Sequence, residues 1–255
     1  MLKLDGITLA YGAVPVLEGI ELGVAAGEFV SLVGPSGSGK TSILRAVTGL
    51  QQPLAGRIAL DVRQDQVGFL FQDDALLPWR TVLDNVTLGL RIRKVARRDA
   101  ESQAAEWLDR LGLDGLAGRF PRELSGGQRK RVAIAQVLAL RPRLLLMDEP
   151  FASLDAIVRT RITQDLLTWV ERERMSVLLV THDLEEAITL SDRVLVLSNG
   201  PRARIKSGYR VPLARPRDLR AARRQPVFGE LTDRLWQDLS DAMTPGDPGL
   251  KEAAE

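Results

Sequence analysis

A chain of 255 residues with 45% hydrophobic residues and a net charge of only +2 has the composition of a soluble globular protein with a sizeable core. It contains no cysteine and one histidine, which excludes disulfides, thiolate metal sites and histidine-cluster metal sites. The small net charge gives no reason to expect a nucleic-acid partner. No apolar run is long enough to cross a membrane and the start has no signal-peptide core, so we expect a cytoplasmic chain.

Two segments carry an excess of basic residues. Residues 91–98 hold five basic side chains and no acid, and residues 201–224 hold nine against one acid, Asp218. Such runs are typical of a solvated surface. Contact with an anionic membrane surface or with a partner protein is the alternative.

The first third of the chain predicts strands around one glycine-rich turn. The apolar run over residues 29–33 has the pattern of a strand buried on both faces. The turn follows it directly and leads into a predicted helix over residues 42–47. Further short strands are predicted over residues 2–10, 16–24, 53–60 and 67–71.

The turn GPSGSGKT, from Gly34 to Thr41, fits the phosphate-loop pattern GxxxxGK[ST] in the strand–turn–helix context that the pattern requires. Glycines let several backbone N–H groups point at one anion, and the helix adds the positive end of its dipole. Lys40 would reach the β- and γ-phosphates of ATP, and Thr41 would ligate Mg²⁺. A glycine-rich turn with an incidental Lys-Thr pair is the alternative. The residues of this segment predicted to bind ATP are Gly34, Pro35, Ser36, Gly37, Ser38, Gly39, Lys40, Thr41 and Ser42.

A helical period replaces the strand pattern between residues 83 and 141. Ala104, Trp107 and Leu108 share one face of a predicted helix over residues 99–111. A second helix is predicted over residues 128–140. The segment therefore reads as a mainly helical insertion.

From residue 144 onward, strands alternate with helices again, which predicts a mostly parallel sheet. A last helix is predicted over residues 226–243, and the charged residues 244–255 are expected to fray. The remaining predictions are strands over residues 144–147, 176–181 and 194–197 and helices over 158–169 and 183–190.

The strand over residues 144–147 ends in two acids, Asp148 and Glu149. Asp148 would help to hold Mg²⁺ beside Thr41. Glu149 would be the general base that takes a proton from the attacking water. An acidic turn at a strand end, without a catalytic role, is the alternative.

The segment LSGGQ resembles the signature of the ATP-binding subunits of ABC transporters. Its residues are Leu124, Ser125, Gly126, Gly127 and Gln128. Ser125 and Gln128 also fit a capping box at a helix start, but two glycines weaken a helix start, so capping alone does not account for the segment. The resemblance implies that these residues contact the γ-phosphate of an ATP held by a second copy of the chain.

Three further positions match landmarks of this family. Tyr11 stands where the family carries an aromatic that stacks on adenine, with a surface tyrosine as the alternative. Gln72 follows Phe71 and an apolar strand, as does the family's glutamine that reaches Mg²⁺ and the attacking water. His182 follows the strand over residues 176–181, where the family carries a histidine that contacts the γ-phosphate. A structural histidine is the alternative.

Ser153, Leu154 and Asp155 resemble the family's loop that touches the partner across the dimer. One position departs from the family pattern, because Gln136 stands where an arginine is usual. The change affects helix contacts and no phosphate-binding role.

The resemblance covers about residues 2–215 and implies an α/β fold. Its elements are a P-loop NTPase (RecA-like) core with a mostly parallel sheet, an antiparallel β part at the N-terminus and an inserted α-helical subdomain. The predicted domains are an ABC ATPase domain over residues 1–215, with core segments 1–82 and 142–215 and helical subdomain 83–141, and a short C-terminal helical tail over 216–255.

The resemblance also implies an assembly. Two copies would close head to tail over two ATP with Mg²⁺, peripheral to the cytoplasmic face of the inner membrane. They would work with transmembrane permease subunits and an extracytoplasmic solute-binding protein. Residues 73–88 would receive a permease helix, since Leu76, Leu77 and Trp79 are apolar in a polar stretch. A place for these three side chains in the core is the alternative.

The stretch FQDDALLPWRTVLDNV and the tail over residues 205–219 resemble the branch that serves nitrate, aliphatic sulfonate and taurine importers. This implies import of a small anion or organic solute without naming it. A non-transport ABC ATPase that acts on a soluble partner is the rival. Chromosome-organising members need a long coiled coil between Lys40 and Ser125, and translation-factor members carry two sets of these motifs, whereas one set is present here.

Overall fold

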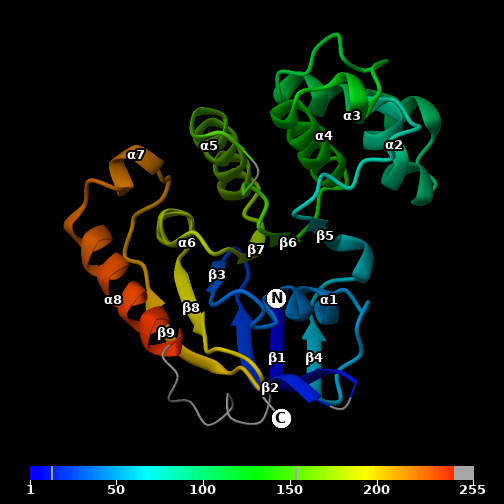
Figure 1. Cartoon of the computed structure of the whole chain (residues 1–255). Coiled ribbons are helices and arrows are strands. Elements are labelled where there is room, and N and C mark those ends of the chain that lie inside the picture. The colour runs from blue at the N-terminus through cyan, green and yellow to red at the C-terminus, as the bar shows by residue number, and fades with distance from the viewer. Residues whose placement is uncertain (13, 153, 244–255) are drawn as a thin grey trace.

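The computed structural model describes residues 1–12, 14–152 and 154–243 (Figure 1). The strands of this part form two sheets. The strands are β1 (Leu2–Tyr11), β2 (Val14–Val24), β3 (Phe29–Val33), β4 (Ala55–Leu60), β5 (Val67–Leu70), β6 (Leu144–Asp148), β7 (Ser176–Val180), β8 (Arg193–Leu197) and β9 (Ile205–Arg210). The smaller sheet is antiparallel, in the order β2-β1-β4. The larger sheet has the order β5-β6-β7-β3-β8-β9, and only its β8–β9 pair is antiparallel.

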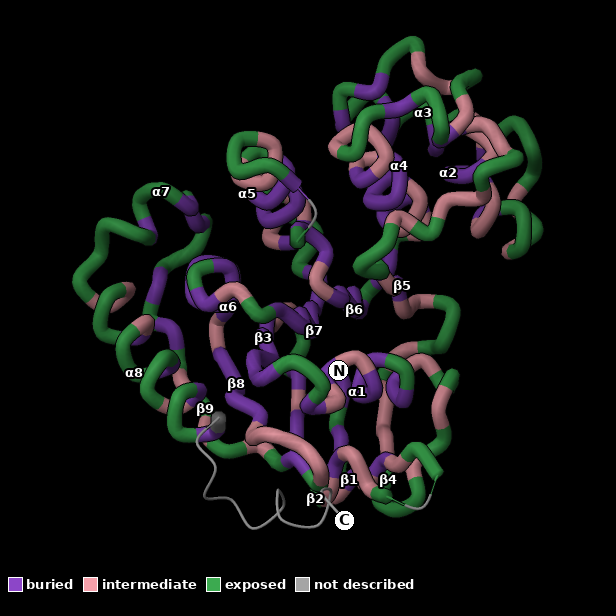
Figure 2. Tube along the Cα trace, in the orientation of Figure 1, coloured by how far each residue is buried: buried purple, intermediate pink, exposed green. Residues whose placement is uncertain are grey.

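The central strands of the larger sheet are buried along their whole length. Every residue of β3, β6 and β7 is buried, and Figure 2 shows them as the purple centre of the molecule. A parallel sheet with both faces covered needs apolar side chains on both, which is why these strands read as continuous apolar runs in the sequence. The predicted α/β fold with a mostly parallel sheet is confirmed.

Helices cover this sheet and form a separate lobe beside it. Helices α2, α3 and α4 gather beyond β5 and β6 in Figure 1, and they confirm the predicted helical insertion. The α-helices are α1 (Lys40–Val47), α2 (Val82–Ile92), α3 (Arg97–Arg110), α4 (Gly126–Leu138), α5 (Ala156–Arg172), α6 (Leu184–Leu190), α7 (Leu219–Ala222) and α8 (Pro226–Met243). Single 3-10 turns cover Gln64–Gln66 and Pro121–Glu123.

Successive residues of β6 point to opposite faces of the sheet and so join two cores. Leu144 and Leu146 pack in a cluster with α1 and the smaller sheet. Leu145 and Met147 pack in a second cluster with α4 and α5. The nucleotide-site residues described below therefore stand on a strand that is fixed from both sides.

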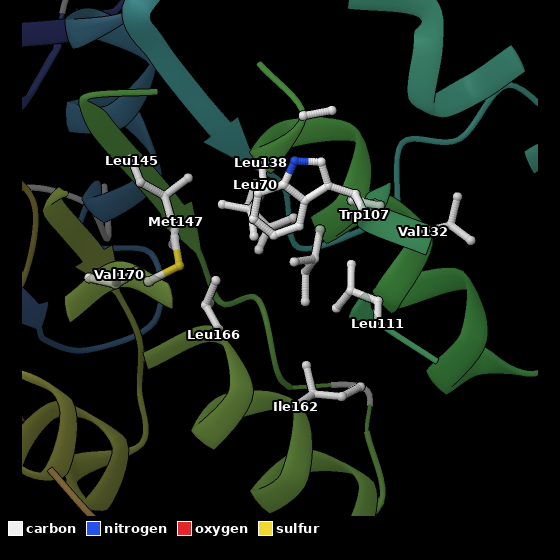
Figure 3. Packing of buried hydrophobic residues seen from close by; sticks show 14 of the residues in the cluster. Leu70, Trp107, Leu111, Val132, Leu138, Leu145, Met147, Ile162, Leu166 and Val170 are labelled. Carbon is white, nitrogen blue, oxygen red and sulfur yellow. The ribbon is translucent and has the colours of Figure 1, made fainter. Parts of the chain in front are cut away.

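The second cluster holds the helical lobe to the sheet. Figure 3 shows Trp107 of α3 and Leu138 of α4 against Leu70 of β5, with Leu145 and Met147 of β6 nearby. The rings of Trp107 and Trp169 of α5 also meet edge to face, with centroids 5.5 Å apart. Such close apolar contacts help to fix the lobe's position through the complementary shapes of the two packed surfaces.

Helix α8 lies over the opposite end of the sheet. Leu231, Leu235 and Leu239 pack with Leu184 of α6 and Val196 of β8. The helix predicted over these residues is confirmed, while residues 244–255, which we expected to fray, lie outside the described part. The boundary between a domain at 1–215 and a tail at 216–255 stays a prediction. Within the described ranges, no helix combines the length and the apolarity that a membrane crossing requires.

Candidate active site

The glycine-rich turn lies between β3 and α1, at the carboxyl end of the central strand. Gly37 and Gly39 have φ values of 79° and 93°, in the left-handed region that suits glycine. A Cβ atom on Gly39 would stand 2.8 Å from Val16 Cγ1, so a side chain has no room there. Gly39 is also the N-cap residue of α1. Backbone N–H groups and a helix N-terminus therefore face the same space, the arrangement that binds phosphate.

Lys40 is buried in this turn. Its Nζ donates hydrogen bonds to the Gly34 and Pro35 carbonyls at 2.8 and 2.7 Å. Burial lowers the pKa of Lys40, and the nearby carboxylates of Glu149 and Asp148 oppose that shift. The ammonium is thus held at the turn by groups of the chain itself.

Thr41 and Asp148 come together from α1 and β6, although 107 positions separate them in the sequence. Thr41 Oγ1 donates to Asp148 Oδ1 at 3.1 Å. Burial raises the pKa of Asp148 above its ordinary value, while the Thr41 hydrogen bond opposes the rise. A half-buried hydroxyl beside a buried carboxylate offers the oxygen donors that a hard divalent cation prefers.

Glu149 and His182 also meet from different strands. His182 Nδ1 lies 2.9 Å from Glu149 Oε2, and the Glu149 backbone N–H donates to the Val180 carbonyl at 2.9 Å. Glu149 has a φ of 42°, which turns its side chain out of the line of β6. Glu149 lines a cavity of about 570 Å³ that Lys40, Thr41 and Gln72 also line. The structure thus brings the predicted general base to the phosphate loop.

The signature segment does not take part in this cavity. Leu124 is buried, and Ser125 begins α4 as the N-cap residue of a complete capping box. Its hydroxyl accepts from the Gln128 N–H at 3.2 Å, and the Gln128 side chain accepts from the Ser125 N–H at 2.9 Å. None of residues 124–128 is among the described residues that line the cavity of Lys40 and Glu149. The capping interpretation is therefore correct for the fold, and the two glycines leave the N-terminus of α4 facing outward.

Comparison with known proteins decides the family. The family model described as "ABC transporter" matches residues 17–152, which include both the phosphate loop and the signature. The chain belongs to the ABC transporter family. The aliphatic sulfonates import ATP-binding protein SsuB 1 of Burkholderia lata is 42% identical over 254 residues, covering 98% of this chain and 74% of the relative.

Two further comparisons extend this result. The aliphatic sulfonates import ATP-binding protein SsuB 2 of Streptomyces avermitilis is 45% identical over 233 residues, covering 91% of this chain and 88% of the relative. A solved dimeric structure of the ATP-binding cassette MJ0796 in a post-hydrolysis state, bound to ADP and Pi, is similar with a TM-score of 0.74. It is 31% identical and covers 84% of this chain and 100% of its own. This ABC chain binds and hydrolyses ATP as a subunit of an importing system.

Tyr11 lies at the mouth of the cavity. Its hydroxyl is 3.1 Å from Ser42 Oγ and donates to Gln51 Oε1, also at 3.1 Å. The ring is 54% exposed and lines the same cavity as Lys40. The predicted adenine contact stays a prediction, with the ring placed where it could be made.

The loop expected to face a partner copy leads into α5. Asp155 caps this helix by accepting from the Val158 N–H at 3.0 Å, and Leu154 is buried in the core. Ser153 lies outside the described residues.

One buried cation near the site was not predicted from the sequence. Lys130 of α4 is fully buried, and its Nζ donates to the Gln72 carbonyl at 2.9 Å and to the Phe71 carbonyl at 3.3 Å. It also pairs with Asp74 at 3.3 Å. Burial lowers the pKa of Lys130, and Asp74 opposes that shift. The sequence holds a signal for this position, because Lys130 shares its helix face with apolar Ile134.

Proposed function

We propose that this ABC subunit powers uptake of an organic sulfonate or a similar small anion through a separate membrane permease. The observation that carries the catalytic part is the Glu149–His182 pair beside Lys40 on the phosphate loop. The solute class is supported by the two sulfonate-import relatives, which cover nearly the whole chain. Solute recognition itself would belong to other subunits.

The proposed chemistry uses five side chains of this chain. Lys40 binds the β- and γ-phosphates and stabilises the charge that develops there. Glu149 accepts a proton from the attacking water, and His182 orients the Glu149 carboxylate while facing the γ-phosphate. Gln72, across the cavity, positions the same water. Tyr11 would carry the adenine ring.

The donor set fits Mg²⁺, since Thr41 Oγ1 and Asp148 Oδ1 are oxygen donors 3.1 Å apart beside the phosphate loop. Thr41, Asp148 and Gln72 would hold the ion. Bound Mg²⁺ would neutralise part of the phosphate charge. Burial raises the pKa of Asp148 and the charge of Glu149 adds to the rise, whereas a bound cation would favour the ionised form.

The position of the signature supports a homodimer. Residues 124–128 stand apart from the cavity of their own chain, so they can serve ATP only on a second copy. Two copies placed head to tail would enclose two ATP and complete both sites. The dimeric cassette among the similar structures supports the same arrangement.

Residues 73–88 support a permease contact. Trp79 is 72% exposed, whereas Leu76 packs against the core of the helical lobe. The core alternative therefore applies to Leu76, and Trp79 is left as an apolar anchor on the surface. The permease would place the chain at the cytoplasmic face of the membrane, and an extracytoplasmic binding protein would deliver the solute.

A pull-down of the tagged chain from detergent-solubilised membranes of its source cell tests this proposal. We expect a multi-pass membrane protein with the wild type and its loss with Trp79→Ala. Trp236→Ala is the matched control, because Trp236 is 66% exposed on α8, away from the proposed contact. The associated binding protein is then screened with alkanesulfonates, taurine and nitrate. Capture of soluble partners alone would show a non-transport ABC ATPase.

A further inference from the structure

A second cavity lies at the opposite edge of the sheet from the nucleotide site. Its volume is about 530 Å³, within the range of small-molecule sites. Gly27, Arg143 and Met175 line it, and they stand just before β3, β6 and β7 respectively. The nucleotide cavity is built at the carboxyl ends of the same strands. The two cavities therefore share strands but no lining residue, and we call this second one the basal pocket.

The basal pocket has an excess of positive charge. Four arginines and two glutamates line it. Both glutamates have a basic partner. Glu106 pairs with Arg110, and Glu173 Oε1 lies 4.0 Å from Nε of Arg172, which is not a lining residue. The side chains of the other three arginines have no hydrogen bond or ion pair to any described residue. These basal arginines are Arg141, Arg143 and Arg174.

The backbone at two basal arginines is unusual for their residue type. Arg141 and Arg174 have φ values of 48° and 49°, in the left-handed region, where they follow the ends of α4 and α5. Glycine is the usual residue at such helix ends because it has no Cβ penalty. At the end of α5 this turn is closed by the Met175 N–H, which donates to the Val170 carbonyl at 3.0 Å, and the turn places Arg174 on the rim of the cavity.

The inner wall of the basal pocket is apolar and aromatic. Leu138, Met175 and Trp107 line it, and all three are buried. The guanidinium of Arg110 lies 5.0 Å from the centre of the Trp107 ring. The Trp107 indole N–H donates to no described residue and is not shut off from solvent, so it can donate to a ligand.

We propose that the basal pocket binds a small organic anion. The basal arginines hold its sulfonate, carboxylate or phosphate group, because guanidinium groups bind such oxygens in a bidentate way. Its aliphatic or aromatic part lies against Trp107, Leu138 and Met175. Since Trp107 belongs to the helical lobe and Arg174 to the core, the bound anion contacts both parts of the molecule.

Isothermal titration of the full chain with 1-hexanesulfonate, in saturating ADP to block the phosphate loop, tests the proposal. We expect one site, binding by sulfate alone about tenfold weaker, and none by hexyltrimethylammonium. Arg143→Gln and Arg174→Gln each weaken hexanesulfonate binding about tenfold. Arg224→Gln, an exposed arginine outside the pocket, stays within about twofold. Hexanoate and hexyl phosphate identify the preferred head group.

Tryptophan fluorescence gives an independent measure of binding in proteins whose pocket arginines are unchanged. Hexanesulfonate changes the emission of the wild type, and Trp107→Phe removes that change while Trp236→Phe keeps it. Unchanged affinity in the Arg143→Gln/Arg174→Gln double variant overturns the proposal. Equal affinity for sulfate and hexanesulfonate overturns the assignment of an organic ligand.

Discussion

Glu149 shows how a single residue is aimed at the site by its backbone. Its φ of 42° costs a residue other than glycine about 1 kcal/mol. The backbone bond to Val180 and the side-chain bond to His182 hold it in that conformation. This backbone conformation therefore turns the Glu149 carboxylate out of the strand direction and toward the phosphate loop.

Replacement of Lys130 by methionine tests its effect on Gln72. Lys130→Met keeps an unbranched side chain but leaves the Phe71 and Gln72 carbonyls without their charged donor. Because the Gln72 segment is then held less firmly, we expect ATP turnover to fall about tenfold and ATP affinity to change by less than about twofold. Steady-state kinetics and nucleotide titration measure the two effects.

Arg129→Met is the matched control for Lys130→Met. Arg129 pairs with the same Asp74 at 3.4 Å with a side chain that is 40% exposed, and its other hydrogen bond goes to the Leu124 carbonyl at 2.8 Å rather than to Phe71 or Gln72. Loss of an exposed pair changes little, so turnover stays near that of the wild type. Normal turnover in Lys130→Met would remove this lysine from the positioning role.

Glu186 makes stability depend on pH. Burial raises its pKa from 4.5 to about 7, with the nearby Asp183 adding to the shift. The folded state thus binds a proton more tightly than the unfolded state, so the free energy of unfolding falls as pH rises from about 4.5 to about 7. The full effect is on the order of 3 kcal/mol.

Glu186→Gln removes this titration and keeps an acceptor for the Thr181 hydroxyl, which bonds Glu186 at 3.1 Å. Urea unfolding at pH 5 and pH 8 measures the difference. The variant gains stability over the wild type at pH 8 and shows little difference at pH 5. A difference that is the same at both pH values would contradict the buried-carboxylate account.

At the scale of the elements, the buried strands and the chemical motifs were the predictable part, whereas the helices predicted from residues 42, 99, 128 and 158 each begin two residues earlier, as α1, α3, α4 and α5. The phosphate loop, the signature and the Asp148–Glu149 tip are runs of neighbouring residues, so a pattern reveals them. Strand β9 was not predicted, because its residues are half-buried or exposed and its sequence IKSGYR has only two large apolar side chains. Helix α7, of four residues, is too short to show a period.

The nucleotide-site motifs predicted Asp148 beside Thr41, but contacts between distant segments that no motif links were not predictable. Lys130 acts on residues 71–74, which no local pattern connects with it. The basal pocket joins Gly27, Arg143 and Met175 from three strand starts, whose proximity depends on the strand order. Both features require the fold before they can be seen.

The contact between α4 and α5 gives a prediction at this scale. A Cβ on Gly127 would stand 2.9 Å from Val158 Cγ1. Gly127→Ala therefore forces the two helices apart and lowers the free energy of unfolding by about 1–3 kcal/mol. Thermal unfolding followed by circular dichroism measures the loss. Val158→Ala, added to Gly127→Ala, removes the methyl groups that clash and restores part of the lost stability. A double variant less stable than Gly127→Ala alone would show that the two helices do not clash at this point.

At the scale of the whole molecule, the phosphate loop and the signature segment of one chain would belong to two different nucleotide sites. The phosphate loop and Glu149 stand in one cavity, while residues 124–128 stand outside it. Under the proposed head-to-tail arrangement, assembly would depend on bound ATP, because the nucleotide would be part of the interface. Hydrolysis would then weaken the contact that ATP made.

Glu149→Gln tests this coupling. The variant binds ATP but lacks the general base, so turnover is abolished and the ATP-bound dimer accumulates. Size-exclusion chromatography with light scattering measures the dimer, and an ATPase assay measures turnover. Lys40→Ala in the same chain weakens ATP binding and returns the protein to monomers. Hydrolysis at the normal rate in Glu149→Gln would remove this residue from the base role.

The place of β3 in the sheet has a consequence for synthesis on the ribosome. Phe29 of β3 pairs with Val177 of β7, and Val30 pairs with Arg193 of β8. At ribosomal rates of about 5–20 residues per second, the partners of β3 emerge roughly 10–30 seconds after it. During that interval a strand with four apolar residues out of five has no sheet neighbour, so the nascent chain is exposed to aggregation until β7 and β8 have emerged.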